Sequence, residues 1–253
     1  RVGREMARGL RGDPALFLNL LERGGMLGAV LPELGALRDA REPGEDGDLL
    51  SHTLRVLGGV ASLSPELRDR AGALWHDVGR GVELRGGDPE ALSMAPGILG
   101  ARRAARRMAL WRWPRGLGRS VEALVRHHSL GADPPSPEGL GRLARRHGTA
   151  WLEGLLTLFW AHGQEGGSFA LWWEAHRREA LALRGRWDRW GGGRVSGDAI
   201  RALTGLSPGP GVGALKARLE EAVDRGEVTS EEGARIWLRR FSSEGVKEGP
   251  GTA

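Results

Sequence analysis

The chain of 253 residues contains no cysteine. This absence excludes a disulfide framework and any metal site with thiolate ligands, and it fits a reducing compartment, so we expect a cytoplasmic protein. The sequence has no run of about 18 apolar residues and does not open with a signal-peptide pattern, so no membrane association is expected.

Lysine is almost absent, since Lys216 and Lys247 are the only two, and arginine therefore supplies nearly all of the positive charge. The net charge of +5 permits an acidic partner such as nucleic acid. A GC-rich genome, which favours arginine, glycine and alanine codons, would give the same bias, and composition does not separate the two explanations. With 40% apolar and 27% charged residues, the chain is globular and long enough to bury a core.

Sustained β alternation is missing, whereas helical spacing recurs throughout, which predicts an all-α fold. Asp13 and Pro14 have the order of an N-cap and a first helical residue, and Leu16, Leu20 and Leu21 then share one face. Residues 81–97 are expected to be irregular. Further helices are expected around 54–60, 67–78, 98–111, 118–130, 138–146, 150–163 and 168–189.

Three glycines at 191–193 predict a flexible joint. We expect a large helical region over residues 1–190, a small helical module over 194–241 and a disordered tail over 242–253. In the small module Ser196 can cap a helix, residues 206–213 form a turn rich in proline and glycine, and Thr229 and Glu232 have capping-box spacing.

Four expected helices each supply an inward polar residue. His76 and Asp77 are adjacent at an expected helix end, where two neighbouring side chains can converge, and His52 lies upstream at the start of another helix. His128 and His162 each follow apolar residues by three and four positions. Imidazole and carboxylate together suit a divalent transition metal or Mg²⁺. The alternative is a set of packed, hydrogen-bonded histidines in a helical core.

This pattern resembles the HD superfamily of metal-dependent phosphohydrolases, whose ligands are a first His, a His-Asp pair and a distal Asp. His52, His76 and Asp77 match the first three, and His162 stands at the distal position. The resemblance implies a divalent metal of open identity at these four residues, with His128 as an additional site residue.

A second resemblance covers residues 1 to about 240 and depends on an ordered set of short segments. The segments are LPEL at 31–34, HTL at 52–54, WHDVGR at 75–80, GA at 100–101, LVRHH at 124–128, SGD at 196–198 and GLSPGPGVG at 205–213. Together they resemble the neck, HD-type body and tail of bacterial CCA-adding tRNA nucleotidyltransferases. Pro96 and Gly97 stand where that family has a His-Glu pair. Because of this change and of His162, no catalytic residue is assigned.

The nucleotidyl-transfer head of that family carries a Gly-Ser or Gly-Gly loop and an Asp-x-Asp pair on a strand, and no β-rich segment here could house them. The first residue is Arg1 rather than Met, so we expect the head, with its Mg²⁺, in an upstream stretch or on a separate chain. The resemblance then implies a non-catalytic, tRNA-binding portion of a CCA-adding or A-adding enzyme. The alternatives are a free-standing HD phosphohydrolase acting on nucleotides or phosphoesters and a degenerate HD scaffold.

Eight arginines and one acid, Glu122, occur between residues 102 and 126. Like charges four residues apart repel on an isolated helix, but the stripe becomes favourable when phosphates lie against it. Trp111 and Trp113 flank the stripe and either stack on a base or belong to the core. The alternative for the arginines is a solvated helix face. The predicted RNA contacts are Arg102, Arg103, Arg106, Arg107, Arg112 and Arg115.

A second RNA contact is predicted at the glycine-rich turn. Glycines let backbone N–H groups approach an anion, and the start of the following helix favours negative charge. The alternative is a tight turn between helices. The residues predicted to form this phosphate cradle are Gly209, Gly211, Gly213 and Lys216.

Overall fold

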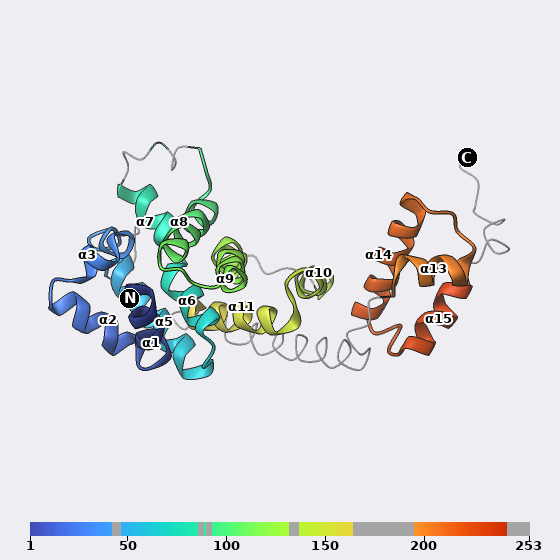
Figure 1. Cartoon of the computed structure of the whole chain (residues 1–253), viewed down its shortest axis with the longest axis horizontal. Helices are drawn as coiled ribbons and strands as arrows, with labels where there is room; N and C mark the ends of the chain where they lie inside the picture. The colour runs from blue at the N-terminus through green and yellow to red at the C-terminus, as the bar shows by residue number, and fades with distance from the viewer. Residues whose placement is uncertain (42–46, 86–88, 90–92, 132–136, 164–194, 242–253) are drawn as a thin grey trace. The chain divides into compact units, whose positions relative to one another are not determined.

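The computed structural model describes residues 1–41, 47–85, 89, 93–131, 137–163 and 195–241, and every regular element within these ranges is a helix (Figure 1). The all-α prediction is therefore confirmed. No helix in this part of the chain is both long and apolar enough to cross a membrane. The chain divides into two compact units, one made of Arg1–Pro134 with Trp151–Ala175 and the other of Pro135–Ala150 with His176–Ala253. The predicted joint at 191–193 and the predicted helix at 168–189 lie outside the described residues, and the domain limits stay a prediction.

The first unit begins with four helices, α1 (Val2–Arg11), α2 (Pro14–Arg23), α3 (Leu27–Val30) and α4 (Pro32–Gly35). It continues with α5 (Leu49–Leu63), α6 (Leu67–Trp75), α7 (Val78–Arg85), α8 (Pro96–Leu110), α9 (Arg115–His127) and the 3-10 turn η1 (His128–Gly131). Helix α11 (Thr149–His162) completes it. Helix α5 packs against α6, α6 against α9 and α9 against α8. The core of the unit includes Leu57, Leu74, Trp75 and Leu158.

Helix α2 begins as predicted, because Oδ1 of Asp13 accepts a hydrogen bond from the amide of Leu16 at 2.9 Å. The predicted apolar face is buried only in part, since of its three leucines Leu21 alone packs against the core. Leu16 and Leu20 are 56% and 55% exposed, whereas Leu18 is fully buried. Helices α1 and α5 pack against α2, and the position of these neighbours, rather than the leucine spacing, decides which side is buried.

The irregular segment predicted at 81–97 is wrong for its first residues, since α7 continues to Arg85. Glycines weaken the local preference for helix, but they also let α7 approach α8 closely. A Cβ built on Gly79 would overlap the carbonyl oxygen of Pro96, and one on Gly100 would lie 3.0 Å from the amide nitrogen of Gly79. Tertiary packing therefore outweighs propensity in α7.

Arg70 is a buried cation that caps the ends of two helices, and we call this arrangement the Arg70 clamp. Nη1 donates to the carbonyls of the last residues of α1 and its C-cap, Leu10, Arg11 and Gly12, at 2.8–3.0 Å. Nε and Nη2 donate to the carbonyls of Ser64 and Ala61 at the end of α5. Carbonyls at a helix C-terminus lack partners within the helix, so the guanidinium satisfies groups that would otherwise be buried without hydrogen bonds.

The second unit contains α10 (Pro137–His147), α13 (Gly197–Thr204), α14 (Pro210–Asp224) and α15 (Glu231–Arg239). Oγ of Ser196 caps α13 as predicted, by accepting from the amide of Ala199 at 3.0 Å. The predicted cap of α15 is one residue early, because Ser230 rather than Thr229 is the N-cap. The small core of α13, α14 and α15 includes Ile200, Leu219, Val223 and Leu238.

Candidate metal centre and cationic surface

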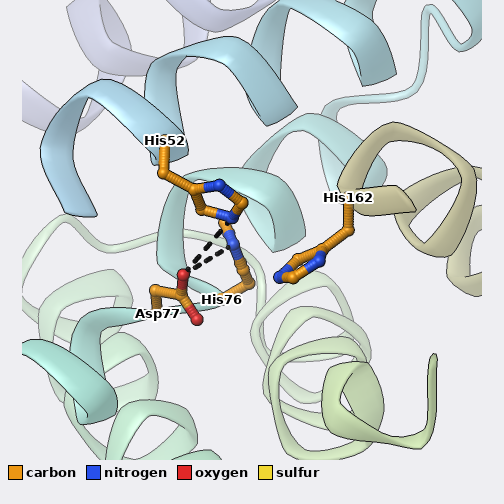
Figure 2. Close-up of side chains that lie close together, drawn as sticks. All are labelled: His52, His76, Asp77 and His162. Atoms are coloured by element: carbon orange, nitrogen blue, oxygen red, sulfur yellow. Dashed lines mark ion pairs between the residues drawn. The ribbon is translucent and has the colours of Figure 1, made fainter. Parts of the chain in front are cut away.

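Three histidines and one aspartate from separate parts of the first unit converge on one point (Figure 2). His52 lies in α5, His162 is the last residue of α11, and His76 and Asp77 lie between α6 and α7. Each side chain offers one ligand atom, and these four atoms all lie within 4.8 Å of one another. The group could therefore hold a metal ion.

The break between α6 and α7 lets two adjacent residues serve one site. Helix α6 ends at Trp75 and α7 begins at Val78, so His76 and Asp77 form the two-residue connection between these helices, and both side chains reach the site. Nε2 of His76 lies 3.1 Å from Oδ2 of Asp77, and Nε2 of His52 lies 3.6 Å from the same oxygen. The predicted position of this pair at a helix end is confirmed.

Two histidines aim a ring nitrogen at the same carboxylate. Nδ1 of His76 lies 2.7 Å from the carbonyl of Ala73, and Nδ1 of His128 lies 2.6 Å from that of Val125. Because a carbonyl only accepts, Nδ1 donates in both contacts, and a neutral ring then has a lone pair on Nε2. Both Nε2 atoms face Asp77, that of His76 at Oδ2 and that of His128 at Oδ1, 3.5 Å away. Lone pairs and a carboxylate facing one another in a buried site need a cation or a further proton between them.

The pKa values of the centre reflect the same shortage of positive charge. Burial lowers the pKa of His76, but the charge and hydrogen bond of Asp77 outweigh burial and raise it. Burial raises the pKa of Asp77, but His76 and His128 outweigh that effect and hold it well below its usual value. Burial and the charge of His76 lower the pKa of His162 to about 3. His162 is nevertheless the exposed member of the group, whereas His52, His76 and Asp77 are buried.

Pro96 and Gly97, which stand where the resemblance implies a His-Glu pair, are the first two residues of α8. Gly97 is buried, and a Cβ there would lie 3.2 Å from the carbonyl oxygen of Arg126. The start of α8 is thus packed against the backbone of α9. Since neither proline nor glycine has a polar side chain, these two residues add no ligand to the centre.

The arginines of the predicted stripe differ in exposure, and Arg107 among them has an ion pair with another helix. Arg102, Arg106, Arg112 and Arg115 are exposed. Arg107 is half-buried, and its Nη2 and Nε both donate to Oε1 of Glu33 in α4. This ion pair was not predicted from the sequence. The only available signal was that Glu33 is the single acidic residue of the LPEL segment.

The remaining arginines of the stripe are half-buried or exposed, and the two flanking tryptophans pack against the core. Arg103 is half-buried, and Arg119 and Arg126 are exposed. Nε1 of Trp113 donates to the carbonyl of Gly3 at 2.8 Å, and the ring of Trp111 packs 5.8 Å from that of Trp75. Both tryptophans pack against the core, so this alternative fits them better than base stacking.

The predicted phosphate cradle lies at the start of α14. The helix begins at Pro210, so Gly211 and Gly213 lie in its first turn rather than in the preceding turn. Proline at the first helical position favours this start. No side chain caps the helix, and its first turn contains no acid. A Cβ on Gly209, Gly211 or Gly213 would meet nothing within 4 Å, so the backbone here is open to an anion.

Comparison with known proteins finds related sequences across nearly the whole chain. The CC-adding tRNA nucleotidyltransferase of Thermus thermophilus is 34% identical over 94% of this chain and 56% of its own length. A multifunctional CCA protein of Halorhodospira halophila is 35% identical over 43% of this chain and 27% of its own length. A second one, of Thioalkalivibrio sulfidiphilus, is 39% identical over 32% of this chain. The chain thus spans about half the length of the first relative and less of the others, and no protein-family model matches it.

Proposed function

Because this chain is related through most of its length to the CCA-adding tRNA nucleotidyltransferases, we propose that it binds tRNA as the helical, non-catalytic portion of such an enzyme. The observation that carries the proposal is the exposed cationic surface of α8, α9 and the turn between them. This surface has one acid, Glu122, which pairs with Arg126. Such a surface is costly in isolation and becomes favourable against a phosphate backbone.

The start of α14 is a second proposed contact. Its open first turn presents amide N–H groups without a competing carboxylate, and Lys216 lies about a turn further along the helix. Arg218, in the same helix, lies 4.7 Å above the ring of Phe241. The two surfaces lie on separate compact units, and each is proposed as a contact in its own right.

Binding and nucleotide addition are tested together on the full chain. A fluorescence titration with tRNA should show binding whose logarithmic affinity falls with log salt by roughly 0.7–0.9 per phosphate neutralised. Incubation with CTP, ATP and Mg²⁺ should add no nucleotide. Absence of binding at low salt would refute the tRNA proposal, and incorporation of CTP or ATP would refute the non-catalytic part. The related proteins give no support for a nucleotidyl-transfer head on a separate chain. The proposal therefore concerns only tRNA binding by the residues of this chain.

A phosphohydrolase is the second candidate function, favoured by the convergence of His52, His76 and Asp77. We expect weak or absent turnover, because the fourth position is His162 and because Pro96 and Gly97 add no polar side chain. Assays with p-nitrophenyl and cyclic phosphodiesters in the presence of Mn²⁺, Co²⁺ or Ni²⁺ check this. Brisk turnover that disappears in Asp77→Asn would favour the hydrolase instead.

A further inference from the structure

We propose that His52, His76, Asp77 and His162 form a closed, four-coordinate zinc site whose role is to hold helices together rather than to activate water. The group supplies three imidazole nitrogens and one carboxylate oxygen. Nitrogen-rich sets favour Zn²⁺, whereas Mg²⁺ and Mn²⁺ prefer oxygen. An aspartate at position 162 would give two nitrogens and two oxygens, so the histidine there shifts the preference toward zinc.

The number of protein ligands separates a structural from a catalytic zinc site. Catalytic zinc keeps three protein ligands and an open position for water, whereas structural zinc has four protein ligands in a tetrahedron. Here four side chains each present one atom to the same point. With all four bound, the tetrahedron is complete.

Contacts outside the ligand set orient two of the ligands. The Ala73 carbonyl accepts from Nδ1 of His76, which leaves Nε2 for the ion. His128 faces Oδ1 of Asp77, which leaves Oδ2 on the side of His52 and His76. His128 can orient Asp77 only with a proton on Nε2, which it then donates to Oδ1, so it is assigned as a positioning residue rather than a fifth ligand.

The site joins parts of the chain that are far apart in sequence. His52 and His76 come from α5 and the end of α6, and His162 comes from the end of α11. Ala161 already lies against α5, since a Cβ on Gly59 would be 3.1 Å from the Cβ of Ala161. A zinc ion would convert this close approach of α5 and α11 into a coordinate cross-link. The inference does not depend on tRNA binding.

The test uses the full chain after metal removal with a chelator. Elemental analysis after adding Zn²⁺ should give one ion per chain, and the Tm should rise by roughly 5–15 °C at saturating zinc. Co²⁺ should give the intense visible absorption of four-coordinate cobalt. Mn²⁺ and Mg²⁺ should leave the Tm nearly unchanged at equal concentration.

Variants assign the ligands. His162→Ala should lose most of the Tm rise, and His162→Asp should keep a site with more affinity for Mn²⁺ relative to Zn²⁺. His128→Ala should keep the four-coordinate cobalt spectrum while zinc binds about 10- to 100-fold more weakly. The proposal is overturned by no bound zinc, by a six-coordinate cobalt spectrum, by Mn²⁺ binding as tightly as Zn²⁺, or by unchanged affinity in His162→Ala. If His162→Ala does not fold, the metal and cobalt measurements on the unaltered chain decide alone.

Discussion

Arg107 and Glu33 form an ion pair in which Nη2 and Nε of the arginine donate to the same carboxylate oxygen, at 2.7 and 2.9 Å. The pair links α8 to α4, and the two side chains are 21% and 13% exposed. This arginine therefore has an intramolecular role, whereas Arg102 and Arg106 of the same helix are exposed.

Removal of Arg107 is expected to cost stability rather than RNA contacts. Arg107→Ala leaves the mostly buried Glu33 carboxylate without its cation, which should lower the free energy of unfolding by about 1–3 kcal/mol. Chemical denaturation measures this loss. Adding Glu33→Gln should recover part of it, because the unpaired charge is then removed. A stable Arg107→Ala protein with weakened tRNA binding would contradict the structural role.

The double variant Arg102→Ala, Arg106→Ala is expected to behave in the opposite way. It should bind tRNA more weakly and reduce the log–log salt slope by up to about 0.9 per lost phosphate contact, with a smaller loss of stability than Arg107→Ala because both residues are exposed. The matched control is the double variant Arg4→Ala, Arg8→Ala, which removes two exposed arginines of α1. Equal loss of affinity in the control would indicate a general charge effect.

Gly213→Ala separates helix stability from backbone access. The position is exposed, helical and free of steric neighbours, so alanine should stabilise α14 by about 0.5–1 kcal/mol. If a phosphate approaches the amides of this turn, the same methyl group should weaken tRNA binding. Stability and affinity would then change in opposite directions. Higher stability with unchanged affinity would remove the proposed cradle.

Gly154→Ala should destabilise the first unit by about 1–3 kcal/mol, because a Cβ at this position would overlap Oδ1 of buried Asp69. Asp69 also accepts from Oγ of Ser64 and from Nε of Arg68, so it cannot move without losing hydrogen bonds. Gly58→Ala in α5 is the control, since a Cβ there meets nothing within 4 Å. Thermal unfolding should show a lower Tm for the first variant and an equal or higher Tm for the control.

The stabilisation by zinc is expected to grow as pH rises from about 6 to about 8. The raised pKa of His76 means that, without metal, its proton stabilises the fold at low pH and that this contribution disappears as pH rises through the raised value. The same proton competes with zinc for Nε2. His162, with its pKa near 3, is neutral throughout this range. The difference in Tm between zinc-loaded and metal-free protein should therefore widen with pH, and a constant difference would count against ligation by His76.

Local sequence signals predicted the helices well where the signal was a cap or a clear apolar repeat. Asp13 and Ser196 cap as expected because their contacts lie within four residues. The face of α2 could not be predicted, since Leu16 and Leu18 differ only in which neighbours they meet. The course of α7 depends on glycine contacts with α8, which no local pattern encodes.

The candidate centre followed from the pairing of His76 with Asp77 and from the apolar spacing around His128 and His162. These signals placed the side chains inward from separate helices. Spacing alone did not rank His128 against His162, because that distinction depends on which side of the Asp77 carboxylate each ring occupies, and only the family resemblance placed His162 at the fourth position. The same signals did not predict that Arg107 forms an ion pair with Glu33 and is therefore less available to RNA than the exposed arginines.

The Arg70 clamp also has a kinetic consequence. Because one guanidinium holds carbonyls at the ends of both α1 and α5, neither helix end can open without breaking bonds to the same buried cation. The last turns of these helices, about fifty residues apart, should therefore exchange amide hydrogens with deuterium through a shared opening event. Their protection would rise and fall together under mild denaturant, whereas the exposed start of α1 would exchange independently.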